Sequence, residues 1–274
     1  MNRKKLINFG LVIFTLGILT FIFWYFFYDT KYTLPKIDLN LTVGELGIDF
    51  TEEISTNSDV SKENLMKLVE DNPENMAYLN ALRLNMNDDL DSYLEFLEQL
   101  GESERVYLQK ALAYIDKLQN PQLGTGRLGQ ISNQSISELE QVLSINEYNW
   151  LAYYARGLNN LYWPVGLKRI DKAIQDLAYC VAVSEEYGNI SNPLWADAYV
   201  AYGDALIKGE DLDTGFQVWK DGLKRFPNHP ELSNRVKSGK EKAYSVVKSI
   251  RGIDSFQRPD ENLTDLSILW TNKE

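Results

Sequence analysis

The stretch that decides the fold is WADAYVAYGDALIKGEDLDTGFQVWKDGLKRFP, residues 195–227. Its apolar residues recur every three or four positions, which is the spacing of one face of an α-helix. A short polar break near Gly209 separates two such segments. Segments of this length joined by a brief turn favour antiparallel helix pairs. We therefore expect residues 195–227 to form one such pair.

Glycines at facing positions would let the two helices of this pair pack closely. Gly203 and Gly215 carry no side chain, so the backbones can approach, and Trp219 would fill the remaining gap. Pro227 cannot continue a helix and would end the second segment. The residues whose spacing resembles the tetratricopeptide repeat family are Tyr199, Tyr202, Gly203, Leu206, Gly215, Trp219 and Pro227. This resemblance implies an all-α solenoid of stacked helix pairs that binds other proteins.

The preceding unit resembles the same pattern but is longer. Gly157 and Ala173 are sixteen positions apart, whereas Gly203 and Gly215 are twelve apart. The excess must loop out around Tyr162–Gly166. Trp163, which precedes a proline in this loop, would either pack into the solenoid as a wedge or project as an anchor for a partner.

Apolar stripes at helical spacing begin near Ser61, and no segment alternates with period two for long enough to predict a strand. The stripes contain Met76, Leu79, Leu82 and Met86, then Leu90, Tyr93, Leu97 and Leu100, then Leu108, Leu112 and Ile115, and finally Leu139, Val142 and Leu143. We expect an all-α architecture with about four repeats over residues 61–229. A polar capping helix over 230–250 and a C-terminal tail over 251–274 would follow.

The N-terminus predicts a membrane anchor. Residues 6–28 contain no charged side chain and are long enough to cross a bilayer. Their aromatic end lacks the small residues of a cleavage site, so we expect an uncleaved signal anchor. The basic flank, residues 1–5, should stay in the cytoplasm. Residues 29–60 would be a linker, although its apolar side chains could dock. The repeats would be extracytoplasmic, which means the periplasm if the cell is Gram-negative.

Composition argues against several classes of function. Cys180 is the single cysteine, which excludes an intramolecular disulfide and a multi-cysteine metal cluster. His229 is the single histidine and lies in an expected turn, which excludes a multi-histidine metal site and a Ser-His-Asp triad elsewhere. We expect Cys180 to be a core thiol and His229 to be a solvated turn residue. A net charge of −11 makes nucleic acid a poor partner. The expected protein has no catalytic residue, cofactor or metal.

Three local motifs are explained by secondary structure alone, without a ligand or a catalytic role. Gly124, Gly126 and Gly129 spell a dinucleotide-loop pattern, but no strand precedes them, so a flexible interhelical loop is expected. Ser135 and Glu138 form a capping box, which predicts a helix start. The acidic run containing Asp88, Asp89 and Asp91 fits a solvated first turn of a helix.

Binding is then the expected function, through a groove lined by the first helices of the pairs. The candidate partner-binding residues are Leu151, Tyr154, Leu158, Tyr162, Trp163, Asp197, Val200, Asp204 and Lys208. Tyr154 and Leu158 are also explained as interhelical core. One function class is a membrane-anchored scaffold or adaptor that binds protein partners in envelope assembly or complex biogenesis. The alternative is a ligand-handling partner of a solute transporter, with a cavity lined by Tyr162, Trp163 and Trp195.

Overall fold

The computed structural model describes residues 17–18, 32–48, 61–259 and 263–271. The chain divides into two units, Met1–Thr33 and Leu34–Glu274. Every regular element in the described residues is helical, which confirms the all-α prediction. None of the helices in these residues is long and apolar enough to cross a membrane. The predicted anchor over 6–28 lies outside the described residues, except for Gly17 and Ile18.

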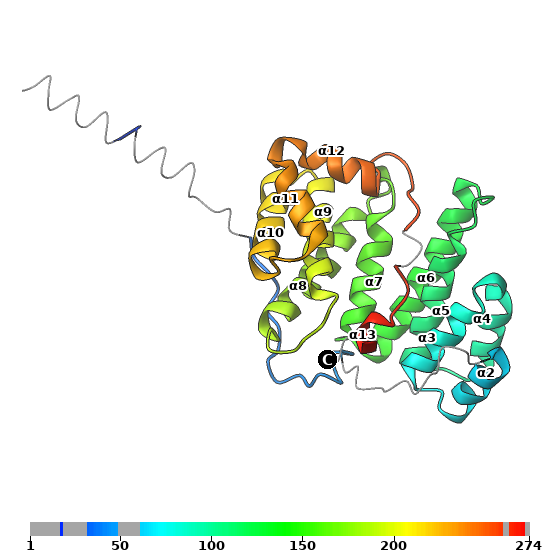
Figure 1. Cartoon of the computed structure of the whole chain (residues 1–274). Coiled ribbons are helices and arrows are strands. Elements are labelled where there is room, and N and C mark those ends of the chain that lie inside the picture. Colours follow the sequence, from blue (N-terminus) through cyan, green and yellow to red (C-terminus); the bar gives the residue numbers. More distant parts are fainter. Residues whose placement is uncertain (1–16, 19–31, 49–60, 260–262, 272–274) are drawn as a thin grey trace, which may run out of the picture. The chain divides into compact units, whose positions relative to one another are not determined.

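The second unit consists of short helices in a regular order (Figure 1). They are α2 (Lys62–Asp71), α3 (Met76–Asn85), η1 (Asn87–Asp89), α4 (Leu90–Gln99), α5 (Glu104–Lys117), α6 (Thr125–Ile145), α7 (Trp150–Leu161), η2 (Val165–Leu167), α8 (Ile170–Glu186), α9 (Trp195–Lys208), α10 (Leu212–Arg225), α11 (Pro230–Ser238), α12 (Lys240–Arg251) and α13 (Ile268–Thr271).

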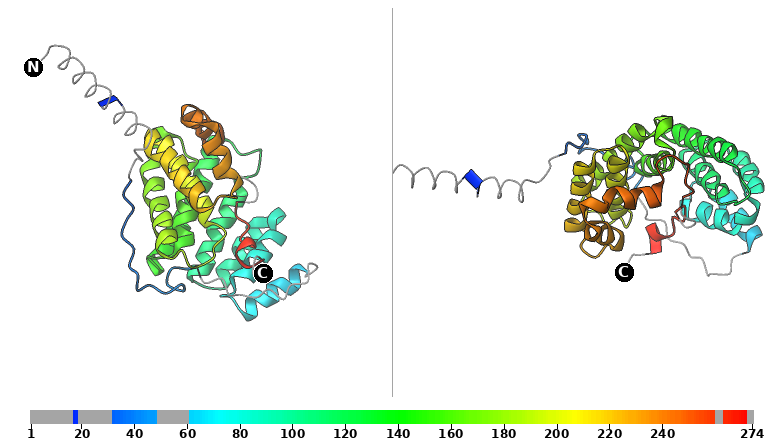
Figure 2. Two further views of the ribbon diagram at one scale, coloured as in Figure 1. Left: turned by 60° about the vertical axis from the view of Figure 1, so that its left-hand side comes forward. Right: turned by 90° about the horizontal axis from the view of Figure 1, so that it is seen from above.

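Successive helices pack as neighbours: α5 on α6, α7 on α8, and α9 on α10. Each pair also contacts the next one, through α6 with α7 and α8 with α9. Viewed from above, the helices of this unit follow a curve with an inner side (Figure 2). The stripes predicted for α3 and α4 contribute Leu79, Leu82, Met86, Leu90, Tyr93 and Leu97 to one core cluster with α2. The stripe predicted for α5, Leu108, Leu112 and Ile115, is buried outside that cluster, to which α5 contributes Val106 and Ala113.

The α9–α10 pair has the close approach that its glycines predict. A Cβ atom on Gly203 would lie 2.9 Å from the carbonyl oxygen of Gly215, and one on Gly215 would lie 2.7 Å from that of Gly203. Trp219 is fully buried beside Gly203, and its Nε1 donates to the carbonyl oxygen of Val200 at 3.3 Å. Helix α10 ends at Arg225, just before Pro227.

The longer α7–α8 unit accommodates its extra residues between the helices. Helix α7 ends at Leu161 and α8 begins at Ile170, with the short turn η2 between them. Gly157 still lies against the second helix, because a Cβ there would be 2.8 Å from Cγ of Leu177. Cys180 is fully buried, as expected of a core thiol.

Two predictions at α6 are wrong. The glycine-rich stretch is not a loop: Gly124 is the N-cap of α6, and Gly126 and Gly129 lie inside the helix. Ser135 is likewise buried in its middle and starts no helix. The physical reason is tertiary packing, since α6 lies along α5 and Gly129 accommodates the ring of Trp163. The free energy of such contacts outweighs the free-energy penalty of placing a glycine inside a helix.

The predicted capping helix over 230–250 is two helices. Gly239 has a positive φ of 81° and breaks the chain between α11 and α12. This conformation favours glycine because other residues meet a steric penalty there. Arg235, expected to be solvated, is buried. The cap therefore has an inner, packed side.

Part of the predicted linker, residues 29–60, packs on the helices. Leu46 and Ile48 are buried, and the amide of Trp150 donates to the carbonyl oxygen of Leu46 at 2.8 Å. The hydroxyl of Tyr187 donates to the carbonyl oxygen of Leu41 at 2.9 Å. Leu39 is 65% exposed and stays outside this contact. The described part of the segment therefore packs on the helices, as the sequence analysis had allowed from its apolar side chains.

Candidate functional site

The inner side of the curve is the candidate site, and the C-terminal segment of the same chain lies along it (Figure 2). We call this side the inner groove; its residues come from α3, α5, α7, α9 and α11. We call residues 252–259 and 263–271 the C-terminal segment. The groove therefore has two parts, one covered by this segment and one open.

The first half of the C-terminal segment is held by backbone groups. The amide of Val165 donates to the carbonyl oxygen of Ile253 at 2.9 Å, and the amide of Gln257 donates to that of Tyr162 at 3.1 Å. The guanidinium of Arg258 donates to the carbonyl oxygen of Leu118 at 2.6 Å, at the C-terminal end of α5. These contacts carry the chain across the ends of α7 and α5.

The second half is held by a buried polar cluster. Arg83 of α3 donates to the carbonyl oxygen of Thr264 at 2.5 Å and forms an ion pair with Asp116 of α5. Asn80 accepts from the amide of Leu266 at 3.2 Å. Burial raises the pKa of the Asp116 carboxyl, and the Arg83 guanidinium opposes that shift. Because Arg83 and Asp116 are buried, the groove beneath the segment contains charged groups that the segment's backbone helps to satisfy.

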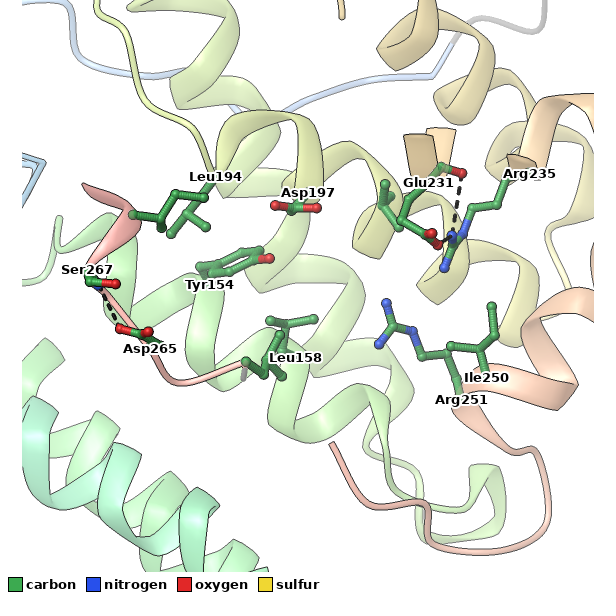
Figure 3. Close-up of a pocket in the computed structure, with 13 residues that line it drawn as sticks. Tyr154, Leu158, Leu194, Asp197, Glu231, Arg235, Ile250, Arg251, Asp265 and Ser267 are labelled. Carbon is green, nitrogen blue, oxygen red and sulfur yellow. Dashed lines mark hydrogen bonds and ion pairs between the residues drawn. The ribbon is translucent and has the colours of Figure 1, made fainter. Parts of the chain in front are cut away.

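The open part of the groove is a pocket of about 410 Å³ (Figure 3). We call it the open pocket. It is lined by Tyr154, Leu158, Leu194, Asp197, Val200, Glu231, Arg235, Ile250, Arg251, Leu263, Asp265, Ser267 and Ile268. Helices α7, α9, α11 and α12 form its walls on one side, and the C-terminal segment forms the other.

A buried charge cluster underlies the open pocket. Asp204, which is fully buried, accepts from Nε of Arg235 at 2.8 Å, from Nη2 of Arg235 at 3.0 Å and from Nε of Arg251 at 2.8 Å. Lys208 is also buried and donates to the carbonyl oxygens of Leu161 at 2.8 Å and Arg251 at 3.0 Å. The cluster connects α9 to α11, α12 and α7.

Burial sets the protonation of this cluster. It lowers the pKa of Lys208 to about 8, and the positive charge of Arg251 acts in the same direction. Burial alone would also lower the pKa of Arg251, but Tyr162 and Asp204 outweigh it and raise that pKa above its usual range. Asp204 thus stabilises two buried guanidinium groups in their charged form.

Several polar atoms of the residues that line the open pocket make no hydrogen bond to a described residue. They are Oη of Tyr154, Oδ2 of Asp197, Nη2 of Arg251, Oε1 of Glu231 and Oδ2 of Asp265. Oδ1 of Asp197 pairs with Nε2 of His229 at 3.2 Å. Burial raises the pKa of Tyr154 well above its usual value, Asp197 raises it further, and Arg251 opposes both. The hydroxyl therefore lies near a carboxylate and a guanidinium.

The predicted groove residues fall into three groups. Tyr154, Leu158, Asp197 and Val200 line the open pocket. Leu151 and Tyr162 lie beside Leu263–Leu266 of the C-terminal segment. The prediction that Asp204 and Lys208 face a partner is wrong, because both are buried within the charge cluster.

Trp163 packs inside the unit. It is 8% exposed, its Nε1 donates to Oγ of Ser132 at 2.7 Å, and its ring meets that of Phe256 at 5.6 Å between centroids. The guanidinium of Arg169 lies 4.3 Å from the ring centroid. The residue is thus a wedge between α6 and the C-terminal segment.

Sequence reasoning missed the basic residues of the site. Arg235 belongs to the region expected to be a solvated cap and Arg251 is the first residue of the predicted C-terminal tail, and the high local polarity concealed their burial. His229, expected to be solvated, is instead the N-cap of α11, where Nδ1 accepts from the amide of Leu232 at 3.4 Å. Nε2 then carries the proton that points at Asp197.

No protein-family model, no curated protein and no solved structure matches this chain. Within the described residues, no group of three or more His, Cys, Asp or Glu side chains is placed to hold a metal ion.

Proposed function

We propose that this protein is a membrane-anchored scaffold or adaptor whose inner groove binds segments of other proteins. The observation that carries the proposal is the C-terminal segment in the groove. Residues 253–259 and 263–267, which precede the short helix α13, lie there outside any helix. They are held by backbone hydrogen bonds that join Ile253 to Val165 and Gln257 to Tyr162, and by side chains of α3 and α5. A groove that holds one such segment has the geometry to hold another of similar chemistry.

A tetratricopeptide-like solenoid is part of the proposal. Helices α3 with α4, α5 with α6, α7 with α8 and α9 with α10 would be its repeats, and α11 with α12 its cap. The approach of Gly203 to Gly215 and the burial of Trp219 support this assignment. Stacked pairs of this kind create extended inner surfaces that commonly bind peptides.

The proposed location rests on the sequence alone. The uncharged span 6–28 would anchor the chain, and the basic flank 1–5 would stay in the cytoplasm. The helical unit would then meet its partners on the extracytoplasmic side. No enzymatic activity and no cofactor are part of the proposal.

The decisive test adds the C-terminal segment in trans. A chain that ends after Gly252 is purified, its helicity is checked by circular dichroism, and a labelled peptide spanning residues 253–271 is titrated against it. We expect saturable binding. A peptide with Leu266→Asp should bind at least about tenfold more weakly, because a buried leucine becomes a charge in an apolar contact.

A second arrangement covers failure of the truncated chain to fold. A protease site is inserted between Pro259 and Leu263 of the whole chain, which is cut after folding. The labelled peptide should then exchange with the released C-terminal piece. A folded groove that binds neither the peptide nor a scrambled control would contradict the proposal, as would equal binding of the two peptides.

The alternative, a ligand-handling partner of a solute transporter, is favoured by one observation, the open pocket of about 410 Å³. The side chains expected to line such a cavity do not meet there. Tyr162 lies beneath the C-terminal segment, Trp163 packs on Ser132, and Trp195 is buried in α9.

A further inference from the structure

The open pocket has polar groups that the fold leaves unused. Tyr154 is only 6% exposed, and its hydroxyl has no hydrogen-bond partner among the described residues. Its ring is fixed by stacking on Trp150, with centroids 5.1 Å apart. Buried polar side chains are normally hydrogen-bonded. A rigid, unpaired hydroxyl that faces a cavity therefore indicates a ligand position.

Two charged groups of opposite sign accompany this hydroxyl. Arg251, also 6% exposed, uses Nε for Asp204 and Nη1 for the hydroxyl of Tyr162, which leaves Nη2 toward the pocket. Asp197 uses Oδ1 for His229 and leaves Oδ2. Figure 3 shows the Arg251 guanidinium and the Asp197 carboxylate from different helices around the space beside Tyr154 and Leu158.

The remaining charges of the pocket are already compensated by neighbours. Arg235 donates to Asp204 and, at 2.5 Å, to Glu231, so this group presents no free donor pair to a ligand. Asp265 accepts from the amide of Ser267 at 2.9 Å and from Asn80 at 3.3 Å through the same oxygen. Asp265 thus keeps Oδ2 unused, as Asp197 does, but it comes from the C-terminal segment on the opposite wall, so we assign the ligand charges to the guanidinium edge of Arg251 and to Oδ2 of Asp197.

Apolar side chains form the rest of the lining. Leu158, Val200 and Ile250 come from three helices, and Leu194, Leu263 and Ile268 complete the surface. Because residues 263–268 form a wall, a long peptide has no straight path from this pocket into the covered part of the groove. The volume, about 410 Å³, lies within the range of small-ligand sites, about 300–1,000 Å³.

We propose that the open pocket binds a small zwitterion, a free amino acid or a dipeptide with an apolar side chain. Its carboxylate accepts from Nη2 of Arg251, its ammonium donates to Oδ2 of Asp197, and the hydroxyl of Tyr154 bonds the ligand between them. The apolar side chain lies against Leu158 and Val200. This site goes beyond the proposed function, because its occupant is a small molecule. Tyr154 and Leu158 also lie beside the C-terminal segment, whereas Asp197, Val200 and Arg251 line the open pocket alone.

Charge matching selects this class over simpler ions. A plain anion would pair with Arg251 but face Asp197 and Asp265, and a plain cation would pair with Asp197 but face Arg251. Only a ligand with both charges places a group of opposite sign beside each of them, in addition to the Asp204 that pairs with Arg251 and the His229 that pairs with Asp197.

The test uses the whole chain and defined probes. The proteinogenic L-amino acids and aliphatic dipeptides are screened by thermal shift, and the best probe is measured by calorimetry. We expect one or more aliphatic zwitterions to bind saturably. The N-acetyl derivative and the carboxamide of the best probe should each bind about tenfold or more weakly, since each loses one charged hydrogen bond.

Two conservative variants locate the site. Asp197→Asn keeps an oxygen for His229 but removes the charge, and Tyr154→Phe keeps the ring that stacks on Trp150. Both should weaken binding of the best probe about tenfold. Asp197→Asn, which removes the partner of the ammonium, should affect the N-acetyl derivative less. Tyr244→Phe, at an exposed position of α12, is the matched control and should bind as the wild type does.

Several results would overturn the assignment. They are an absence of binding by any zwitterion, equal binding of the N-acetyl derivative or the carboxamide, and unchanged affinity in both variants. Binding of the peptide 253–271 to its groove is a separate measurement. A failure of zwitterion binding would therefore not contradict the proposed scaffold function.

Discussion

Asp204→Ala tests whether the charge cluster holds the C-terminal end of the helical unit together. Asp204 accepts three hydrogen bonds at 2.8–3.0 Å from two buried guanidinium groups. Its removal leaves Arg235 and Arg251 without their shared anion. Breaking one side of a buried ion pair costs about 3–5 kcal/mol. Because domains are stable by only about 5–15 kcal/mol, this loss should be large and easily measured.

The assay is urea unfolding of the whole chain, followed by tryptophan fluorescence and circular dichroism. Asp213→Ala is the matched control, because Asp213 is exposed and pairs with Lys240 at the surface. Exposed pairs contribute about 0–1 kcal/mol, so this variant should be close to the wild type. A cost below about 1 kcal/mol for Asp204→Ala, equal to that of the control, would refute the reasoning that this carboxylate is a structural anion.

Trp219→Ala should destabilise the unit by about 3–5 kcal/mol, as large aromatic truncations in cores do, and an unchanged melting temperature would remove Trp219 from the core. Trp163→Ala should also lower the stability of the isolated chain, and loss of partner capture with stability intact would show instead that its ring is a partner anchor. Lys208→Met should become less stable relative to the wild type as the pH rises from about 8 to 10.5. The pKa of Lys208 is about 8 in the folded state and 10.5 in the unfolded state, so between these pH values the unfolded wild type binds more protons. Raising the pH therefore stabilises the folded wild type but not the variant. Chemical denaturation of both chains across this pH window measures the difference, and a constant difference would contradict it. Protease added to cells with a permeabilised outer layer should digest the helical unit if it is extracytoplasmic, whereas protection until the inner membrane is lysed would overturn the proposed orientation.

The groove could be predicted only in part. Tyr154, Leu158, Asp197 and Val200 line the open pocket because they recur on one face of α7 and α9, a pattern visible in the sequence. Trp163, with the same aromatic character, packs inward. Periodicity assigns a residue to a helix face, but whether that face meets another part of the chain depends on segments far away in the sequence.

The all-α architecture and the close α9–α10 pair could be predicted from the amino-acid sequence. Both follow from local rules: helical spacing of apolar residues, and two glycines that let backbones approach beside Trp219. Tertiary structure decided the rest. Arg235 and Arg251 are buried because Asp204, which lies 31 and 47 positions earlier in the chain, compensates them. The segment around Thr264 docks because Arg83, 181 positions earlier, needs its carbonyl oxygen. A buried charge is stable only beside its partner, and the chain brings such distant partners together only when it folds.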